Sequence, residues 1–240
     1  MIDAHFHRNV YDTFLAVDGK EYRFYGVHPW QCAIGTIAPP GNAGEVGAQS
    51  SRLRVLLESD PHAGVGEIGL DRLKTREVSP VQREMFARQL ALASELHRPA
   101  VLHGAKCWGE VVKACKPHAG KIPAFLFHGF SRSGGLLPDI CALNGFVSVG
   151  PAVLNDHAVN YRELVKEIPL ERLLVETDVD VGRCDGEGAA ATPERDGEGA
   201  AATPSAEAVL KGTAAVRGMD AAELEGIIVA NARRFVESLA

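Results

Sequence analysis

The sequence has 240 residues, of which 46% are hydrophobic, and its 25 Lys and Arg against 31 Asp and Glu give a formal net charge of -6. This composition excludes disorder over the whole chain and predicts a soluble protein with an apolar core, of a length that suits one α/β domain, since barrels of this class run to roughly 250 residues. The acidic balance excludes a broad basic surface, so any contact with nucleic acid must come from local cations or bound metal.

Cysteine usage and hydropathy predict the compartment. The five cysteines include no C-x-x-C pair, which is typical of free thiols in a reducing environment. No run approaches the ~20 apolar residues of a membrane span, and the first residues lack the basic and apolar segments of a signal peptide. We therefore expect a cytoplasmic protein with no membrane association and no obligate protein partner.

Short runs rich in β-branched and aromatic residues alternate with longer stretches of helical apolar spacing. This alternation predicts a parallel sheet with helical crossovers. Seven such runs favour a TIM-type (β/α) barrel over a small open sheet. The predicted strands are 2–6, 24–27, 64–70, 100–103, 124–130, 146–150 and 173–177.

The segment after the first strand departs from this pattern. It contains no good helix, and Asp18-Gly19 lies between two strand-like runs, 13–17 and 20–25. An Asp-Gly pair in this position predicts a two-residue hairpin turn. A crossover helix is therefore missing from the start of the barrel.

The clearest helix begins after Ser79. Ser79 can cap it, Pro80 fits the first helical position and Gln82 completes a capping box. Apolar residues then recur on one face as far as Leu96, as expected of a helix packed on a sheet, and Pro99 ends the segment.

The C-terminal part contains a repeat and two predicted helices. The nine-residue sequence DGEGAAATP begins at Asp185 and again at Asp196. Two short glycine-rich copies cannot form a solenoid, so we interpret 183–203 as a flexible loop extended by duplication within a single domain of residues 1–240. Helices are predicted at 204–217 and 220–235.

Histidines and carboxylates occur at the ends of predicted strands. His5 and His7 lie two apart on one face of the first strand, where both imidazoles can bind one divalent ion. Taken alone, this spacing is equally typical of ordinary polar residues that follow a strand. Glu67 lies between glycines in an apolar strand, where burial without a cation would be costly.

Three further candidates, His103, His128 and Asp178, lie at or near the ends of other strands. In a parallel barrel the carboxyl ends of all strands open onto one face, so these side chains should converge with His5, His7 and Glu67. Histidine and carboxylate ligands suit Zn, Mn, Mg, Fe or Co, and a bridging carboxylate suits two ions ~3.5 to 4 Å apart. We therefore expect two divalent ions, of an identity that the pattern does not decide.

These segments together resemble the TatD family of metal-dependent hydrolases, also described as TatD-like deoxyribonucleases. The resemblance runs through most of the chain, and although each motif alone would be weak, the combination is specific. The motifs that carry it are His5-Phe6-His7, Gly26-Val27-His28-Pro29, Gly66-Glu67-Ile68-Gly69-Leu70-Asp71, Gln89-Leu90 with Glu95-Leu96, Leu102-His103, His128-Gly129-Phe130-Ser131 and Glu176-Thr177-Asp178.

The resemblance implies a specific division of roles. His5, His7 and Asp178 would hold one ion, His103 and His128 the second, and Glu67 would bridge the two. It implies hydrolysis of a phosphodiester, in DNA ends or in a small molecule, by a metal-activated water. Asp178 would orient that water and accept its proton, so that Asp178 and Glu67 are the expected catalytic residues.

The resemblance also suggests substrate contacts. His28 corresponds to a family position near the mouth of the site, and Lys106 and Arg132 follow His103 and His128 and could meet a phosphate. For each of these three the alternative, a structural histidine or a solvated charge, is equally open. Asp71 and Glu176 could orient metal ligands through hydrogen bonds.

The chain also departs from the family pattern. The stretch after His7 is short where a typical member has a helix and a strand, so the barrel is expected to lack one βα unit there. Gly104-Ala105-Lys106 replaces a common Ser-Arg continuation, and Val179-Asp180 replaces a small residue and proline. Two alternatives therefore stay open: a metal-dependent hydrolase of a lactone, amide or other small carbonyl compound on the same barrel, and a non-catalytic binding protein.

Overall fold

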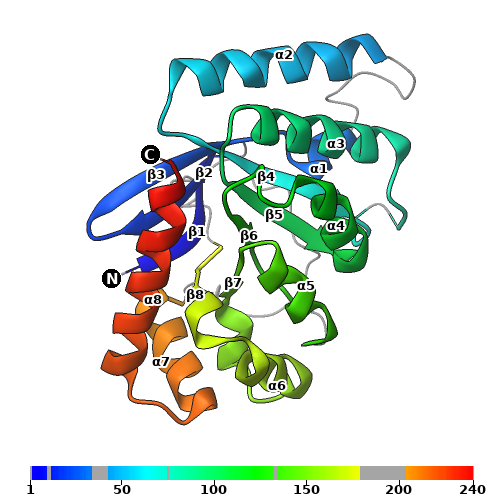
Figure 1. The fold of residues 1–240 in the computed structure, drawn as a ribbon. Helices are drawn as coiled ribbons and strands as arrows, with labels where there is room; N and C mark the ends of the chain where they lie inside the picture. Colours follow the sequence, from blue (N-terminus) through cyan, green and yellow to red (C-terminus); the bar gives the residue numbers. More distant parts are fainter. Residues whose placement is uncertain are drawn as a thin grey trace.

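The structure is a computed structural model that describes residues 2–9, 12–33, 43–74, 76–131, 134–178 and 204–239. Its eight strands form one sheet in the order β1 to β8, with helices around the outside (Figure 1). The predicted TIM-type α/β barrel is confirmed. The strands are β1 (Ile2–Asn9), β2 (Asp12–Val17), β3 (Lys20–Tyr25), β4 (Gly64–Asp71), β5 (Ala100–Ala105), β6 (Phe125–Phe127), β7 (Gly145–Val149) and β8 (Leu173–Val175).

Helices follow most of the parallel strands and pack against their outer face. The described α-helices are α1 (Pro29–Ala33), α2 (Ala43–Ser59), α3 (Pro80–Glu95), α4 (Trp108–Cys115), α5 (Leu137–Ala142), α6 (Val159–Glu167), α7 (Ala206–Arg217) and α8 (Ala221–Val236). Figure 1 shows α2 as an outer layer over α3 rather than against the strands. Short 3-10 turns are Lys116–His118, Gly134–Leu136, Pro151–Leu154, Leu170–Arg172 and Glu237–Leu239.

The first three strands form an antiparallel meander in place of a βα unit. β2 pairs antiparallel with both β1 and β3, whereas β3 to β8 pair parallel. Asp18 and Gly19 turn the hairpin with φ of 54° and 73°, the left-handed values that an Asp-Gly turn supplies. The predicted hairpin is confirmed, and because β2 fills the gap, the barrel wall keeps eight strands without the missing crossover.

The predicted strand boundaries are wrong at several carboxyl ends. The runs 124–130 and 173–177 shorten to β6 and β8. The chain leaves the ladder there because it turns toward the barrel mouth, where Gly129 has a φ of 55° and Asp178 a φ of 52°. The residues that were expected to end these strands therefore lie on the turns that follow them.

The helix caps follow the sequence closely. Ser79 Oγ accepts a hydrogen bond from the Gln82 backbone amide at 3.1 Å, and α3 begins at the proline between them. The predicted capping box is only half formed, because the Gln82 side chain accepts from the Asp71 amide at 3.2 Å instead. Asp220 caps α8 through the amides of Ala222 and Glu223. The three predicted helices are confirmed to within a few residues at each end.

α8 covers the end of the barrel opposite the strand termini that carry the histidines. Phe235 of α8 stacks on Phe24 at 6.0 Å and meets Phe146 edge-on at 5.7 Å between ring centroids. Phe24 pairs with the first residue of β4, and Arg233 forms an ion pair with Asp18 in the hairpin turn. This packing closes one end of the barrel and leaves the carboxyl ends of the strands as its open end.

Two further observations concern the chain as a whole. In the part of the chain that the structure describes, no helix combines the length and the apolar character needed to cross a membrane. The repeat at 185–203, Cys184 and Arg132 lie outside the described residues, so the predictions that concern them stay predictions.

Candidate active site

The predicted ligand residues meet at the open end of the barrel. His5 and His7 project from β1, and their Nε2 atoms lie 3.0 Å apart. His128 follows β6, and its ring stacks on that of His5 at 3.9 Å. Chain segments more than 100 residues apart thus present imidazoles to one point, as the convergence of strand ends predicts.

Glu67 lies at the centre of this cluster. Its Oε2 atom is 3.4 Å from Nε2 of His5 and 3.4 Å from Nε2 of His7. Its Oε1 atom is 2.6 Å from Nδ1 of His103 and 2.6 Å from Nε2 of His128. The two oxygens of one buried carboxylate therefore face two different pairs of histidines.

The local sequence of β4 explains how Glu67 reaches this position. Every residue of β4 is buried, and the ladder to β5 has a register shift between Val65 and Ile68. Gly69 has a φ of 149°, and a Cβ on it would lie 2.0 Å from the carbonyl oxygen of His103. Only glycine allows β4 to approach the strand that carries His103 so closely.

Asp178 approaches the cluster from the turn after β8. Its Oδ1 atom lies 3.4 Å from Nε2 of His5 and 3.8 Å from Nε2 of His7, and its side chain is 49% exposed. Its backbone amide donates to the carbonyl of His5 at 3.0 Å. Asp178 is thus the most open of the acidic residues here and faces both the histidines and the solvent.

Asp71 orients His103. The Nε2 atom of His103 is 2.9 Å from Oδ2 of Asp71. Burial raises the pKa of Asp71, but hydrogen bonds from His103, the Lys74 amide and Trp30 outweigh it and hold this pKa below its usual range. An ionised carboxylate can only accept, so Nε2 of His103 donates to Asp71 and Nδ1 donates to Glu67. Burial lowers the pKa of His103, but these two carboxylates outweigh it and raise this pKa. Because Asp71 holds the proton on Nε2, Nδ1 is the nitrogen that would give up its proton and offer a lone pair to a bound ion.

Glu176 lies beside His128 but accepts its hydrogen bonds from other groups. Its Oε1 atom accepts from the Gly129 amide at 2.7 Å, and its Oε2 atom accepts from the Ser148 hydroxyl. Nδ1 of His128 faces Oε1 at 3.8 Å. This Nδ1 has no hydrogen-bond partner among the described residues, and Nε2, 2.6 Å from Oε1 of Glu67, is the nitrogen that faces the centre of the cluster.

His28 has the opposite orientation. Its Nδ1 atom accepts from the Trp30 backbone amide at 3.2 Å, so the neutral ring carries its proton on Nε2, which lies 3.3 Å from Oε1 of Glu67. Burial lowers the pKa of His28 and outweighs the opposing effect of Glu67. His28 lies within the cluster, but it is arranged to donate a hydrogen bond rather than to bind a metal.

The remaining predicted substrate contacts are only partly described. Lys106 is exposed on the turn after β5, has a φ of 57° and forms no ion pair with a described residue. Arg132 lies outside the described residues. The rim therefore offers Lys106 as a free cation next to His103, and the structure does not test Arg132.

The charges of the cluster depend on one another. Burial raises the pKa of Glu67, but the neighbouring His128, His28 and His103 lower it well below its usual range. Burial and His128 lower the pKa of His5, but its bonds to Asp178 and Glu67 outweigh them and raise it to about 9. The carboxylates of the cluster are stabilised only if positive charge is present among the imidazoles.

The donor set fits divalent metal. The cluster contains three groups of three side chains. Within each group, every residue offers one ligand atom, and these atoms lie within 4.8 Å of one another. Nδ1 of His5 is buried without a hydrogen-bond partner among the described residues, so Nε2 is the atom that the ring offers to the centre. Neutral imidazole nitrogens and carboxylate oxygens are the usual ligands of Zn, Mn and Fe. The groups are His5, His7 and Glu67; His5, His128 and Asp178; and His28, Glu67 and His103.

Sequence reasoning missed Trp30. Its indole Nε1 donates to Oδ2 of Asp71 at 2.6 Å, and its ring lies 4.7 Å from that of His28 and 6.1 Å from that of His103. Its position directly after His28 and Pro29 is the only signal in the sequence, and a single aromatic residue on a short helix carries little information.

Comparison with known proteins identifies what the chain is similar to. A family profile described as TatD related DNase matches residues 2–237. The 3'-5' ssDNA/RNA exonuclease TatD of Erwinia tasmaniensis is 31% identical over 209 residues, 86% of this chain and 79% of that protein. The uncharacterized metal-dependent hydrolase YabD of Bacillus subtilis is 31% identical over 126 residues, 52% of this chain and 49% of that protein. The chain thus spans about half the length of several curated relatives it matches.

Solved structures support the same fold. YJJV, a TatD homologue from Escherichia coli K12, superposes with a TM-score of 0.65 at 22% identity, covering 89% of this chain and 76% of that chain. An uncharacterized amidohydrolase from Saccharomyces cerevisiae gives a TM-score of 0.64 at 18% identity, covering 88% and 78%. At these identities the likeness concerns the barrel alone.

Proposed function

Because the chain belongs to the TatD related DNase family, as its motifs predict, we propose that it is a metal-dependent hydrolase that cleaves phosphodiester bonds of single-stranded nucleic acid. The named activity of its Erwinia relative, a 3'-5' ssDNA/RNA exonuclease, supports this substrate class. The observation that carries the proposal is Glu67, whose Oε2 faces His5 and His7 while its Oε1 faces His103 and His128.

The two oxygens of Glu67, each facing a different pair of histidines, support two positions for divalent ions. His5, His7 and Asp178 would hold one ion beside Oε2. His103, through Nδ1, and His128, through Nε2, would hold the other beside Oε1. This is the division that the family resemblance implies, and a shared carboxylate is the usual bridge in two-metal sites.

Bound at these positions, the ions would lower the pKa of a water molecule and neutralise negative charge on the phosphate. Asp178, half-exposed and 3.4 Å from His5, is placed to orient a water and accept its proton. His28 would donate from Nε2 to a phosphate oxygen, and Lys106 would attract the phosphate at the rim. Asp71 holds the imidazole of His103 in the required tautomer, and Glu176 adds a negative charge beside His128.

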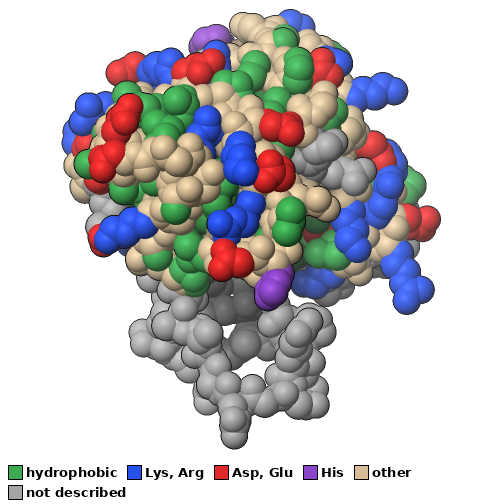
Figure 2. All heavy atoms as spheres, turned by 90° about the horizontal axis from the view of Figure 1, so that it is seen from below, with side chains coloured by type: hydrophobic (Ala, Val, Ile, Leu, Met, Phe, Trp, Pro, Cys, Tyr) green, Lys and Arg blue, Asp and Glu red, His purple; other side chains and the backbone are tan. Residues whose placement is uncertain are grey.

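The surface charge is consistent with a local rather than a global attraction for nucleic acid. The chain has a formal net charge of -6, and Figure 2 shows Lys and Arg side chains interspersed with Asp and Glu on the face that it presents. The positive charge that binds a phosphate would therefore come from the ions and the few cations at the mouth.

The proposal is tested with purified protein, Mn²⁺ or Mg²⁺, and a 5'-labelled single-stranded oligonucleotide. We expect EDTA-sensitive shortening of the strand and a loss of at least about 100-fold in rate for Asp178→Asn, because removal of a proton acceptor costs about this much. Cleavage that persists unchanged in Asp178→Asn would come from a contaminating nuclease, and no cleavage with any ion would refute the nuclease function.

The alternative of a carbonyl substrate is not favoured by the family match or by the named relatives. A panel of phosphodiesters, lactones and N-acyl compounds assayed with the same preparation separates the two. Turnover of a lactone or amide without turnover of any phosphodiester would reverse the assignment.

A further inference from the structure

An exposed tryptophan lies at the edge of the metal cluster. Trp30 is 38% exposed, whereas Trp108 packs in the core at 2%. The Trp30 indole is fixed by its hydrogen bond to Asp71, and its ring meets that of His28 at 81°. Trp30 and His103 are both hydrogen-bonded to Asp71. The indole is therefore a large, fixed and partly exposed ring beside the cluster, and the proposed chemistry does not use its surface.

A lysine lies on the same ring. Nζ of Lys74 is 3.8 Å from the centroid of Trp30, and Lys74 forms no ion pair with a described residue. The backbone amides of Leu73 and Lys74 donate to Oδ1 of Asp71 at 2.7 and 2.8 Å. Asp71 thus holds three groups at once: His103 in the cluster, the indole of Trp30, and the loop that carries Lys74.

Together the ring and the ammonium have the properties of a nucleotide subsite. Aromatic faces stack on bases of any sequence, and a nearby cation pairs with the adjoining phosphate. From this juxtaposition we propose that Trp30 and Lys74 form a platform that stacks one base of a single-stranded nucleic acid beside the scissile phosphate. The proposal rests on the function proposed above and adds to it a contact with the base.

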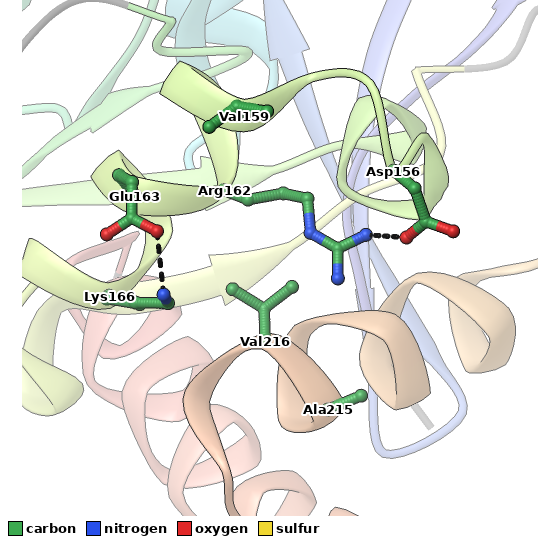
Figure 3. Close-up of a pocket in the computed structure, with 7 residues that line it drawn as sticks. All are labelled: Asp156, Val159, Arg162, Glu163, Lys166, Ala215 and Val216. Atoms are coloured by element: carbon green, nitrogen blue, oxygen red, sulfur yellow. Dashed lines mark hydrogen bonds and ion pairs between the residues drawn. The ribbon is translucent and has the colours of Figure 1, made fainter.

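The platform differs from the charged pocket between α6 and α7. A cavity of about 280 Å³ between α6 and α7 is lined by Arg162 and Lys166, but both cations are already paired, Arg162 with Asp156 and Lys166 with Glu163 (Figure 3). None of the residues that line this cavity is aromatic. An unpaired cation on an exposed ring is what distinguishes the Trp30 platform.

The test compares two strands that differ only in their bases. Binding of a labelled oligothymidine and of an abasic strand of equal length is measured by fluorescence anisotropy in Mn²⁺, with phosphorothioate linkages in both strands to resist cleavage. Trp30→Leu should weaken binding of oligothymidine about tenfold, since stacking on one aromatic ring accounts for roughly that factor, and leave the abasic strand unaffected. Oligothymidine should also quench the fluorescence of Trp30.

Trp30→Phe separates stacking from the hydrogen bond to Asp71. Phenylalanine keeps an aromatic face but lacks the indole donor, so it should retain most of the preference for oligothymidine. Equal losses in Trp30→Leu and Trp30→Phe would place the effect on Asp71 and overturn the platform. Equal weakening of both strands by Trp30→Leu, or no weakening, would overturn it as well.

Lys74→Met tests the cation. It should weaken both strands and lower the slope of log affinity against log salt by about one, because one phosphate contact is lost. Lys20→Met is the matched control, since Lys20 is an exposed lysine at the start of β3, at the opposite end of the barrel. An equal effect of the two lysine variants would contradict a specific role for Lys74.

The outcomes also distinguish this inference from the proposed function. If the wild-type protein binds oligothymidine more tightly than the abasic strand but cleaves no unmodified strand in Mn²⁺, the platform is supported and the nuclease function is refuted. If the protein cleaves DNA but binds both strands with equal affinity, the nuclease function is supported and the platform is refuted.

Discussion

Two histidines of the cluster differ in which ring nitrogen faces its centre. His103 has its Nε2 occupied by Asp71, so Nδ1 is free for a metal. His28 has its Nδ1 occupied by the Trp30 amide, so its Nε2 carries the proton toward Glu67. Both side chains lie against the same carboxylate, but only His103 has its other nitrogen fixed as a donor, which leaves the nitrogen that faces Glu67 available to a bound ion.

This difference predicts the effect of Asp71→Asn. The asparagine amide can donate to Nε2 of His103, which moves the ring proton to Nδ1 and removes the metal-binding lone pair. Changes to such orienting groups typically cost 10- to 100-fold in metal affinity, and we expect a loss in this range. Competition for the metal with a chelating dye measures the affinity. Asp139→Asn, on a surface residue paired with Lys116, is the control; equal affinity in the two variants would contradict the tautomer assignment.

The residue-level predictions from sequence succeeded where a strand end determines the position. His5, His7, Glu67, His103 and Asp178 all converge with His128 because parallel strands open onto one face. The sequence could not indicate the direction of the His28 ring, because that depends on which backbone amide approaches Nδ1. Their roles as ligands stay predictions until metal binding is measured.

At the level of elements, a side chain closes the barrel. β1 and β8 share no described ladder, but Asp3 of β1 accepts from the Thr177 amide at 3.0 Å and from its hydroxyl at 2.6 Å, just after β8. The next residue, Asp178, donates to the carbonyl of His5. Asp3 therefore connects the two ends of the sheet and positions ligands on both.

Asp3→Ala should lower the free energy of unfolding by about 1 to 3 kcal/mol, because three hydrogen bonds to a partly buried carboxylate are lost, two from Thr177 and one from the His5 amide. Urea unfolding of the metal-free protein measures this. Thr177→Val removes only the hydroxyl bond and should cost less, about 1 kcal/mol. If Asp3→Ala unfolds at the same urea concentration as the wild type, the closure does not depend on Asp3.

The elements that sequence predicted are those with local signals. Ser79 caps α3 and Asp18-Gly19 turns the hairpin, as predicted, and Asp220 caps α8 at the position where a helix was expected to begin. α2 has no comparable signal: Val55 is 64% exposed, and few of its residues are buried. Its position is decided by packing on α3, a tertiary contact that no local pattern contains.

At the level of the whole molecule, the cluster connects distant parts of the barrel. Its ligand residues come from β1, β4 and β5 and from the turns after β6 and β8, so a bound ion would restrain five segments at once. Anything that binds the folded chain and not the unfolded one raises its stability. Removal of metal with EDTA should therefore lower the midpoint of thermal unfolding, and the size of this change should depend on pH.

The direction of this pH dependence follows from the protonation of His5. Its pKa in the metal-free protein is raised to about 9 from an ordinary value of 6.5, so its proton stabilises the metal-free fold fully below pH 6.5, and this contribution is lost as pH rises through 9. Metal binding must displace the same proton, so metal affinity increases over the same range. The difference in unfolding midpoint between metal-loaded and EDTA-treated protein should therefore widen from pH 6.5 to 9.

Differential scanning calorimetry at several pH values checks this widening, and titration calorimetry in two buffers of different ionisation enthalpy counts the protons. We expect release of at least about one proton on metal binding at pH 7, because His5 is protonated there in the absence of metal. His62→Ala, an exposed histidine outside the cluster, should leave the count unchanged. A count of zero, or a midpoint difference that is constant from pH 6.5 to 9, would mean that metal does not bind through the His5 imidazole.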